Sequence, residues 1–451
     1  MKKENYLIDI IDLPEDEWIY LNKEGVIRRL LESVIFTYHP TIRGSYKKIR
    51  ELTNFSKWFI NKLHRKSRKK IKIAHFKLLV SLLPKSKQER FLHIFRRHIS
   101  KIGTRNSILN PKIPISFNSI EGAKILGDLL TDCSLNSNFQ VTYSNSNLTR
   151  IFNNLQTIHK LLVGEELSLL KENNFSALHL GKLLRKLEGK GRVKFTFVRQ
   201  VKKNKSGPNI CYQLTFTNIL GKILNKNLKI PKGRRVYTNP QVPDFILSSD
   251  ELSGAFIGRI FSNEGHVETF GATVCHSIDL TDVIKKSKLK NKEEIKNFLE
   301  ENRQFVSPKL LWGYRKILLY LECKKPSEPF ATRQYLTKSG EFRVKWTIYV
   351  GGRDIVTLLN KVEFDKDFEN PLRKYTNSVR FFKIEKQSQV ERILPIAKQL
   401  QSDLGCFTPK MIANTLNLNI TTVYKHINMI RRDATITPVN KIGKTTFYKV
   451  S

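Results

Sequence analysis

Two segments of this chain share one design, and their repetition constrains the fold more than any other sequence feature. Each is a helix-forming stretch with small and apolar residues along one side, and each ends on an acid, Asp132 or Glu264. After each acid the residue pattern predicts the same order of strands, a helix, strands and a closing helix. The sequence therefore predicts an internal duplication within an α+β fold.

The predicted elements of the two copies can be given by their bounds. In the first copy they are a strand Asn138–Ser144, a helix Asn147–Val163, strands Arg192–Val201 and Cys211–Thr217 joined by the turn Lys202–Pro208, and a helix Asn218–Leu228. In the second they are a strand Thr269–Ser277, a helix Lys292–Glu301, strands Lys316–Glu322 and Glu341–Val350, and a helix Arg353–Val362.

Small residues on the two acid-ended helices predict that these helices pack closely against each other. Gly127 in the first helix, and Ala255 with Gly258 in the second, would let the backbones approach. Asp132 and Glu264 would then emerge side by side from adjacent C-terminal ends, where the helix dipoles add to the negative potential. Such a pair attracts cations, and Mg²⁺ prefers carboxylate oxygens. Taken singly, each segment is better explained as a surface helix that ends in a solvated acid, so the prediction depends on the pair.

The charge of the chain is the strongest signal in its composition. Lys and Arg number 80 against 40 Asp and Glu, which gives a formal net charge of +40. A chain of this kind repels itself unless a polyanion neutralises it, and a phosphate backbone is the usual polyanion. Because the basic residues are spread over the whole length, we expect an extended nucleic-acid contact. A basic ribosome-associated or generally solvated protein is the alternative.

The cysteines and the N-terminal residues indicate where the protein resides. The five cysteines are widely separated and form no pair at zinc-binding spacing. Acidic residues interrupt the start of the chain, where a signal peptide needs an apolar run. No window is apolar over the length of a membrane span. We therefore expect an intracellular, cytoplasmic protein with reduced thiols and no membrane partner.

Residues 1–112 read as a helical region made of several short segments. Within it, Ser45–Leu63 has helix-turn-helix spacing, with Ile49 facing inward and Ser56 capping the second helix. The basic run Arg65–Lys72 follows directly. The region is therefore either a DNA-binding helix-turn-helix or an ordinary two-helix corner.

Residues 387–451 read as a winged helix-turn-helix. Val390–Leu404 and Ile420–Arg432 are predicted helices, Thr408 caps a short helix between them, and the end of the chain forms a hairpin. Ile420, Val423, Ile427 and Ile430 would form the buried face of the last helix. The residues left for DNA are Thr421, Thr422, Lys425, His426 and Asn428, with Lys441 and Lys444 in the wing. A protein-interaction module is the alternative.

Motifs around the two acids resemble the LAGLIDADG family of homing endonucleases. ILGDLLTDCS at 125–134 and FIGRIFSNEG at 256–265 are similar to the motif that names the family. YSNSNL at 143–148, ILGKILNK at 219–226, IPKGRR at 230–235 and VPDFIL at 242–247 are similar to its flanking segments. The similarity spans roughly residues 115 to 385, and the ordered set is more specific than either motif alone.

The resemblance implies a fold, a site and a substrate. It implies two αββαββα repeats, 113–240 and 241–386, whose sheets form a saddle on double-stranded DNA. Asp132 and Glu264 would be catalytic ligands of Mg²⁺, with backbone carbonyls supplied by the adjoining residues Cys133 and Gly265. Lys345, with Gln213 as its counterpart in the first repeat, would steady the attacking water or the scissile phosphate.

Three functions remain open on the sequence alone. The first is a site-specific, Mg²⁺-dependent endonuclease that cuts double-stranded DNA. The second is a transcriptional regulator that kept the saddle for binding and lost cleavage, which the departures Cys133, Arg259 and Asn263 from the family pattern favour. The third is a maturase that binds intron RNA. In each case one chain carries both repeats, so we expect a monomer.

Overall fold

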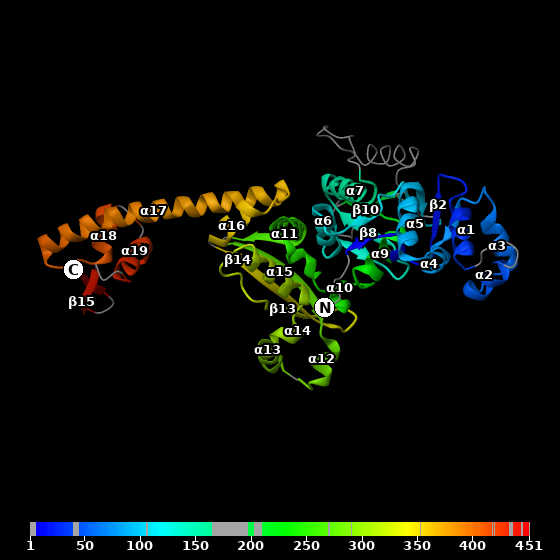
Figure 1. The fold of residues 1–451 in the computed structure, drawn as a ribbon. Helices are drawn as coiled ribbons and strands as arrows, with labels where there is room; N and C mark the ends of the chain where they lie inside the picture. The colour runs from blue at the N-terminus through cyan, green and yellow to red at the C-terminus, as the bar shows by residue number, and fades with distance from the viewer. Residues whose placement is uncertain are drawn as a thin grey trace. The chain divides into compact units, whose positions relative to one another are not determined.

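The computed structural model describes residues 6–38, 45–104, 107–164, 197–202, 210–268, 271–289, 291–351, 353–416, 418, 420–432, 436–442 and 445–450. It has mixed helices and small antiparallel sheets, which confirms the α+β class (Figure 1). The chain divides into two compact units, Met1–Glu369 and Asn370–Ser451. Most of the predicted turn Lys202–Pro208, and Lys444, lie outside the described residues. The finer four-part division stays a prediction.

The described part of residues 1–112 contains a sheet as well as helices. The helices are α1 (Val26–Tyr38), α2 (Ser45–Thr53), α3 (Lys57–His64), α4 (Ile73–Ser81) and α5 (Lys85–His98), with a 3₁₀ turn at Ile10–Asp12. The sheet has the order β3-β2-β4-β5, from Lys70–Lys72, Trp18–Leu21, Ile99–Ile102 and Ile108–Leu109. A purely helical reading of this region was therefore wrong, because its strands are too short to show alternation.

The predicted cap between α2 and α3 is present. The Ser56 hydroxyl accepts a hydrogen bond from the Phe59 amide at 3.2 Å, and Ile49 is buried, whereas Trp58 is 66% exposed. A short ribbon of β1 (Leu7–Ile8) and β6 (Ile115–Ser116) leads from this region into the first copy.

The first copy follows the predicted order. Its elements are α6 (Ile120–Leu129), β7 (Cys133–Leu135), β8 (Val141–Asn145), α7 (Leu148–Val163), β9 (Phe197–Lys202), β10 (Ile210–Thr215), α9 (Asn218–Asn227) and the short α10 (Arg235–Thr238). The four strands form an antiparallel sheet in the order β7-β8-β10-β9. Short β7, which directly follows Asp132, was not predicted.

The second copy repeats this arrangement with an insertion of helices. Its elements are a 3₁₀ turn (Asp244–Ser248), α11 (Asp250–Glu264), β11 (Gly265–Glu268), β12 (Gly271–Asp279), α12 (Thr281–Lys286), α13 (Lys292–Glu301), α14 (Arg303–Val306), α15 (Lys309–Tyr320), β13 (Phe330–Leu336), β14 (Phe342–Gly351) and α16 (Arg353–Lys361). The sheet order is β11-β12-β14-β13, so the strands follow the same path as in the first copy.

One predicted strand of the second copy is wrong. Lys316–Glu322 belongs largely to α15, and the strand that completes the sheet is β13, further along the chain. The run ILLYL at 317–321 has no charged residue to break it, so it fits a buried strand or a buried helix. The buried residues of α15 show the helical spacing: Leu310, Leu311, Tyr314, Ile317 and Leu318.

The acid-ended helices α6 and α11 pack against each other through the predicted glycine of α6. A β-carbon at Gly127 would lie 2.7 Å from Cβ of Arg259 and 3.1 Å from the Phe256 carbonyl oxygen, so a larger residue would push the helices apart. Gly258 has a different neighbour from the one predicted. A β-carbon there would lie 2.4 Å from the Glu363 carbonyl oxygen, in the chain segment after α16.

The second unit has its own apolar core. It contains the later part of α17 (Lys366–Leu404), α18 (Pro409–Leu416), α19 (Ile420–Arg432) and the hairpin β15 (Ile436–Ile442) with β16 (Thr445–Val450). Phe407, Ile412, Val423, Ile427 and Tyr448 are among the buried residues of this core. The Thr408 hydroxyl accepts a hydrogen bond from the Met411 amide, as predicted for the cap of α18.

The described helices include none with the length and apolar character that crossing a bilayer requires. Cys133, Cys275, Cys323 and Cys406 are free thiols.

Candidate active site

The two acids stand at matched places in the two copies. α6 and α11 both begin after a serine that caps the helix: Ser119 accepts from the Gly122 amide at 3.1 Å, and Ser249 accepts from the Leu252 amide at 3.2 Å. Asp132 lies directly before β7, and Glu264 ends α11 directly before β11. The two helices therefore start in the same way, and each acid directly precedes a strand, although α6 ends at Leu129 and α11 continues to Glu264.

Each acid is contacted by a side chain from the second strand of its own sheet. The Asn145 amide donates to Asp132 Oδ2 at 2.8 Å, and Nδ1 of His276 lies 3.2 Å from Glu264 Oε2. Strand register puts Ser144 opposite Asp132 and Cys275 opposite Glu264. Asn145 and His276 are the next residues along, so they occupy equivalent positions. One copy offers its acid an amide and the other offers an imidazole.

The imidazole of His276 is held from both sides. Burial lowers its pKa, and the charge of Glu264 opposes that shift. A neutral ring donates from Nδ1 to Glu264 and accepts at Nε2 from the Tyr314 hydroxyl, which lies 3.1 Å away. Burial raises the pKa of Tyr314 well above its usual range, so this hydroxyl keeps its proton.

Arg235 links the ends of the two helices. Its guanidinium NH1 donates to Glu264 Oε1 at 2.9 Å and also to the carbonyl oxygen of Leu130, at the C-terminal end of α6. A cation is stabilised there by the carboxylate and by the partial negative charge of a helix end. Glu264 thus has a charged partner on one oxygen and His276 on the other.

Asp132 makes no such ion pair with the described residues. Burial raises its pKa to about 6; the Asn145 hydrogen bond opposes this shift, and the negative charge of Glu264 adds to it. Burial also raises the pKa of the adjoining Cys133 thiol well above its usual range. Cys133 therefore offers the site its backbone carbonyl, as the resemblance implies, and not a thiolate.

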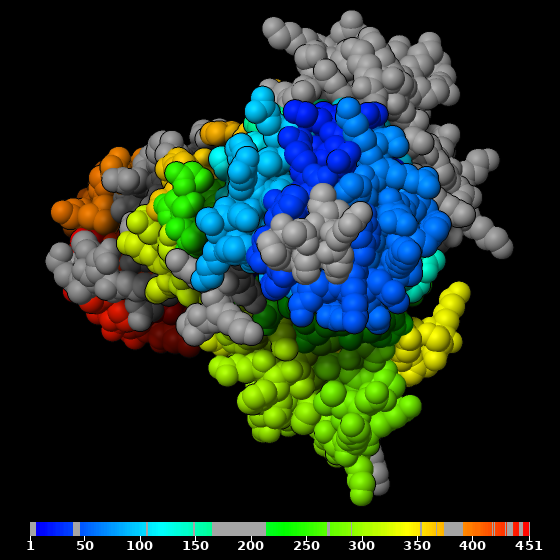
Figure 2. Space-filling model, turned by 45° about the vertical axis from the view of Figure 1, so that its right-hand side comes forward, coloured from blue at the N-terminus to red at the C-terminus, as the bar shows by residue number. Residues whose placement is uncertain are grey.

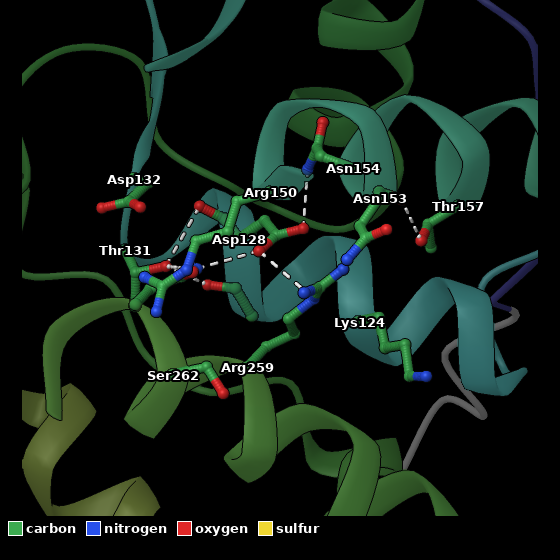
Figure 3. A network of polar contacts seen from close by, with 12 residues as sticks. Lys124, Asp128, Thr131, Asp132, Arg150, Asn153, Asn154, Thr157, Arg259 and Ser262 are labelled. Atoms are coloured by element: carbon green, nitrogen blue, oxygen red, sulfur yellow. Dashed lines mark hydrogen bonds and ion pairs between the residues drawn. The ribbon is translucent and has the colours of Figure 1, made fainter. Parts of the chain in front are cut away.

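A buried polar network lies beneath the acids, between α6, α7 and α11 (Figure 3). Asp128 is fully buried and accepts from the amides of Asn263 at 2.8 Å and Asn154 at 2.6 Å. Arg259 Nε lies 3.6 Å from Asp128, and its NH1 donates to Asp365 at 3.1 Å. Burial raises the pKa of Asp128, and Arg259 opposes that shift. These contacts explain why Arg259 and Asn263 interrupt the small and apolar pattern of α11.

The predicted catalytic residues of the second copy share one cavity. It has a volume of about 830 Å³, and Cys133, Arg235, Glu264, His276 and Lys345 are among its lining residues. Lys345 lies on β14 with an exposed side chain. The cavity therefore brings a carboxylate, a guanidinium and a lysine together beside the second sheet.

The first-copy counterpart of Lys345 is not the predicted Gln213. In the first sheet Gln213 pairs with Ser144, which is the residue opposite Asp132. In the second sheet Lys345 pairs with Ser277. Ser277 lies two residues beyond Cys275, which is the residue opposite Glu264. By register, Gln213 corresponds to Thr347, and Lys345 corresponds to Cys211. The prediction assumed one constant offset between the copies, and the second copy has extra residues before β13.

The predicted DNA-facing residues of α19 differ in how exposed their side chains are. Thr421, Lys425 and Asn428 are exposed and Thr422 is half-buried, while Lys441 is exposed on β15. His426 is only 6% exposed, because it falls on the same helical face as Val423, Ile427 and Ile430. Its placement on the groove-facing side was wrong. Ile420, predicted to be buried, is 39% exposed.

One of the two acids is better suited than the other to bind a divalent cation. The predicted ligand set is the carboxylates of Asp132 and Glu264 with the backbone carbonyls of Cys133 and Gly265. Asp132 fits, because it is a partly desolvated carboxyl beside another acid. Glu264 fits less well, since both of its oxygens already have partners. The described residues contain no group of three or more acid, histidine and cysteine side chains suited to a metal.

Sequence reasoning missed Arg235, Asn145 and His276, which contact the two acids. Arg235 and Asn145 lie inside segments whose resemblance to the family was noted, so the segments were found but the roles were not. His276 carries no sequence signal of its own, because its position depends on strand register. Compared with protein-family models and with curated proteins, the chain matches none.

Proposed function

We propose that this chain is a site-specific endonuclease of LAGLIDADG type that cuts double-stranded DNA with Mg²⁺. The observation that carries the proposal is the matched placement of Asp132 and Glu264 at the ends of two packed helices, each followed by a sheet of the same strand order. This arrangement is what two αββαββα repeats would produce, and it sets one acid for each DNA strand.

The chain's own residues have distinct tasks in this proposal. Asp132 and Glu264 hold Mg²⁺, which would supply Lewis-acid stabilisation of the scissile phosphate and an activated water. Lys345, in the cavity with Glu264, donates to a phosphate oxygen. Arg235 must share Glu264 with the metal or turn toward the phosphate. Burial raises the pKa of Asp132 to about 6, which is still below neutral pH, so the carboxyl is mostly ionised there and a bound cation would relieve an unfavourable buried charge.

The second unit supports DNA binding. Its α18, α19 and hairpin are consistent with the proposed winged helix-turn-helix, and the exposed side chains of Thr421, Lys425 and Asn428 line one face of α19. The net charge of +40 favours contact with a polyanion over a long surface.

One observation favours a second function, a DNA-binding regulator without cleavage. Arg235 already gives Glu264 the positive partner that a metal would give it. If this ion pair persists on DNA, the chain binds its target and does not cut it.

Cutting of a randomised duplex library separates the two functions. Purified protein with Mg²⁺ is compared with the Asp132→Asn/Glu264→Gln variant, which keeps the size and hydrogen-bonding capacity of both side chains. Metal-dependent double-strand breaks that the variant does not make support the endonuclease. Enrichment of one bound sequence with no breaks supports the regulator, and binding to structured RNA alone contradicts both.

A further inference from the structure

The basic run that begins in α3, part of which flanks the predicted helix-turn-helix, folds around a cleft that the proposed function does not use. Residues 57–72 contain eight Lys and Arg and no acid. The structure bends this run into α3, a turn and the edge strand β3, and forms a cavity of about 340 Å³. The lining residues are Tyr20, Lys62, Arg65, Ser67, Arg68, Lys69 and Lys70. The N-terminal part of the chain that carries it is drawn in blue and faces the viewer in Figure 2.

The backbone around the cleft is fixed by hydrogen bonds. The Leu21 amide donates to the Lys69 carbonyl at 2.7 Å, and the Gly25 amide donates to the Lys66 carbonyl at 2.9 Å. The Arg68 amide closes the turn on the Arg65 carbonyl at 3.1 Å. The cations are therefore set close together by the fold and are not merely neighbours in sequence.

The positive charge of the cleft is poorly compensated. Lys69 pairs with Glu24 at 3.2 Å, but Lys62, Arg65, Arg68 and Lys70 make no ion pair with an acid in the described part of the chain. Arg68 Nε is buried without a hydrogen-bond partner. Burial lowers the pKa of Arg68, as expected when a cation loses water without gaining an anion. A folded chain tolerates this cost where an anionic ligand uses the site.

The aromatic ring in the cleft is not free to stack on a base. The ammonium groups of Lys101 and Lys70 lie 4.7 Å and 5.9 Å from the Tyr20 ring centroid. Single-strand binding sites need open aromatic faces, whereas a duplex presents its phosphates outward. The geometry of the cleft therefore favours the backbone of a double helix.

We propose that this cleft binds the phosphate backbone of duplex DNA, without reading its sequence. The proposal rests on the proposed function for its ligand, because the chain must engage DNA. It adds a contact made by Arg65, Arg68 and Lys70, separate from the two acids and from α19. This contact would hold DNA outside the stretch that is cut.

Salt-dependent DNA binding tests the cleft, with a matched control from the same region. The cleft variant is Arg65→Gln/Arg68→Gln/Lys70→Gln, and the control is Lys85→Gln/Lys87→Gln/Arg90→Gln, which removes three exposed cations of α5. Fluorescence anisotropy is measured in EDTA on a mixed-sequence duplex, with structured RNA and heparin as parallel probes. We expect the cleft variant to lose roughly 10- to 100-fold in duplex affinity near ~0.1 M salt, with a salt slope shallower by about 2 to 3.

A thermal melt separates binding from folding. Removing unpaired cations should leave the melting temperature of the cleft variant unchanged or raised at low salt. A lower melting temperature would mean that these residues are structural, and would overturn the proposal.

The remaining outcomes are also decisive. Equal losses in the cleft and control variants would show only general attraction and would overturn the proposal. Unchanged duplex binding by the cleft variant, with Mg²⁺-dependent cutting intact, would overturn the cleft and leave the proposed function standing. A parent protein that binds RNA but no duplex would overturn both, and a loss confined to heparin would overturn the assignment to DNA.

Discussion

Asp132 and Glu264 occupy equivalent positions in two copies of one fold, yet their surroundings differ in charge. Asp132 has an amide partner, Asn145, and a raised pKa. Glu264 has a guanidinium and an imidazole, Arg235 and His276. The backbone duplication therefore fixes where the acids lie, and a few side chains decide how each acid is neutralised. Asp132 is the acid that most needs a further cation.

The largest effect on stability is expected from the buried polar network of Asp128, Arg259 and Asp365. Arg259→Ala leaves Asp128 and Asp365 without their shared cation, and we expect a loss of roughly 3 to 5 kcal/mol in unfolding free energy. Urea denaturation measures it. The double variant Asp128→Leu/Arg259→Met removes both charges and should recover part of the loss. A single variant as stable as the parent would show that the network does not support the helix ends.

Replacing each acid by its amide should change the stability of the folded protein in opposite directions. The pKa of Asp132 lies at about 6 in the folded protein against 3.8 for a free side chain, so the folded state keeps a proton that the unfolded state has lost. Stability therefore falls as pH rises from about 4 to about 6. We expect Asp132→Asn to stabilise the protein by roughly 2 kcal/mol at pH 8 and to have no effect near pH 4. Melting curves across this pH range measure the change.

Glu264→Gln is the matched substitution in the second copy. It removes the ion pair with Arg235 and weakens the contact with His276, so we expect a loss of about 1 to 2 kcal/mol at pH 8. If both substitutions changed stability in the same direction, the two acids would not differ as described.

Removing the guanidinium of Arg235 should leave Glu264 without an ion pair to the described residues, as Asp132 is. Arg235→Gln frees one oxygen of Glu264, and we expect divalent-ion affinity in the absence of DNA to rise by about tenfold, or 1.4 kcal/mol. Calorimetric titration with Ca²⁺ measures this, with Arg234→Gln, the neighbouring arginine, as the control. Unchanged affinity in the Arg235 variant would mean that Arg235 and the metal do not compete.

The smallest effect is expected from exchanging the equivalent strand residue. His276→Asn places in the second copy the residue that stands at the matching site of the first. The loss of the Tyr314 hydrogen bond should cost about 0.5 to 1.5 kcal/mol in unfolding free energy. Denaturation beside the Tyr314→Phe variant measures it. A double variant that loses the sum of both single effects would show that the two side chains do not interact.

The sequence predicted the parts of this structure that depend on local pattern. The helix caps at Ser56 and Thr408, the bounds of α7 and α9 to within one residue, and the strand β14 follow from residue spacing. Lys316–Glu322 was misassigned because an unbroken apolar run fits two structures. The sheet in the described part of residues 1–112 was missed because its strands are only two to four residues long.

The site residues stay a prediction, and the structure adds the side chains that contact them. Asp132, Glu264 and Lys345 were found from motifs and from the resemblance, and the last two line one cavity. Arg235 and His276 reach Glu264 through tertiary packing and strand register, which spacing along the chain does not encode. His426 was misplaced because a histidine is compatible with both faces of an amphipathic helix.

Strand-specific cleavage of a selected target tests most directly whether both acids serve one reaction. A duplex chosen by binding is labelled separately on each strand and incubated with Mg²⁺ and saturating protein, then resolved under denaturing conditions. The parent should cut both strands, and Asp132→Asn and Glu264→Gln should each lower the rate by at least about a thousandfold at equal occupancy. A parent protein that saturates this target and leaves both strands whole, with Arg235→Gln equally inactive, would contradict the endonuclease.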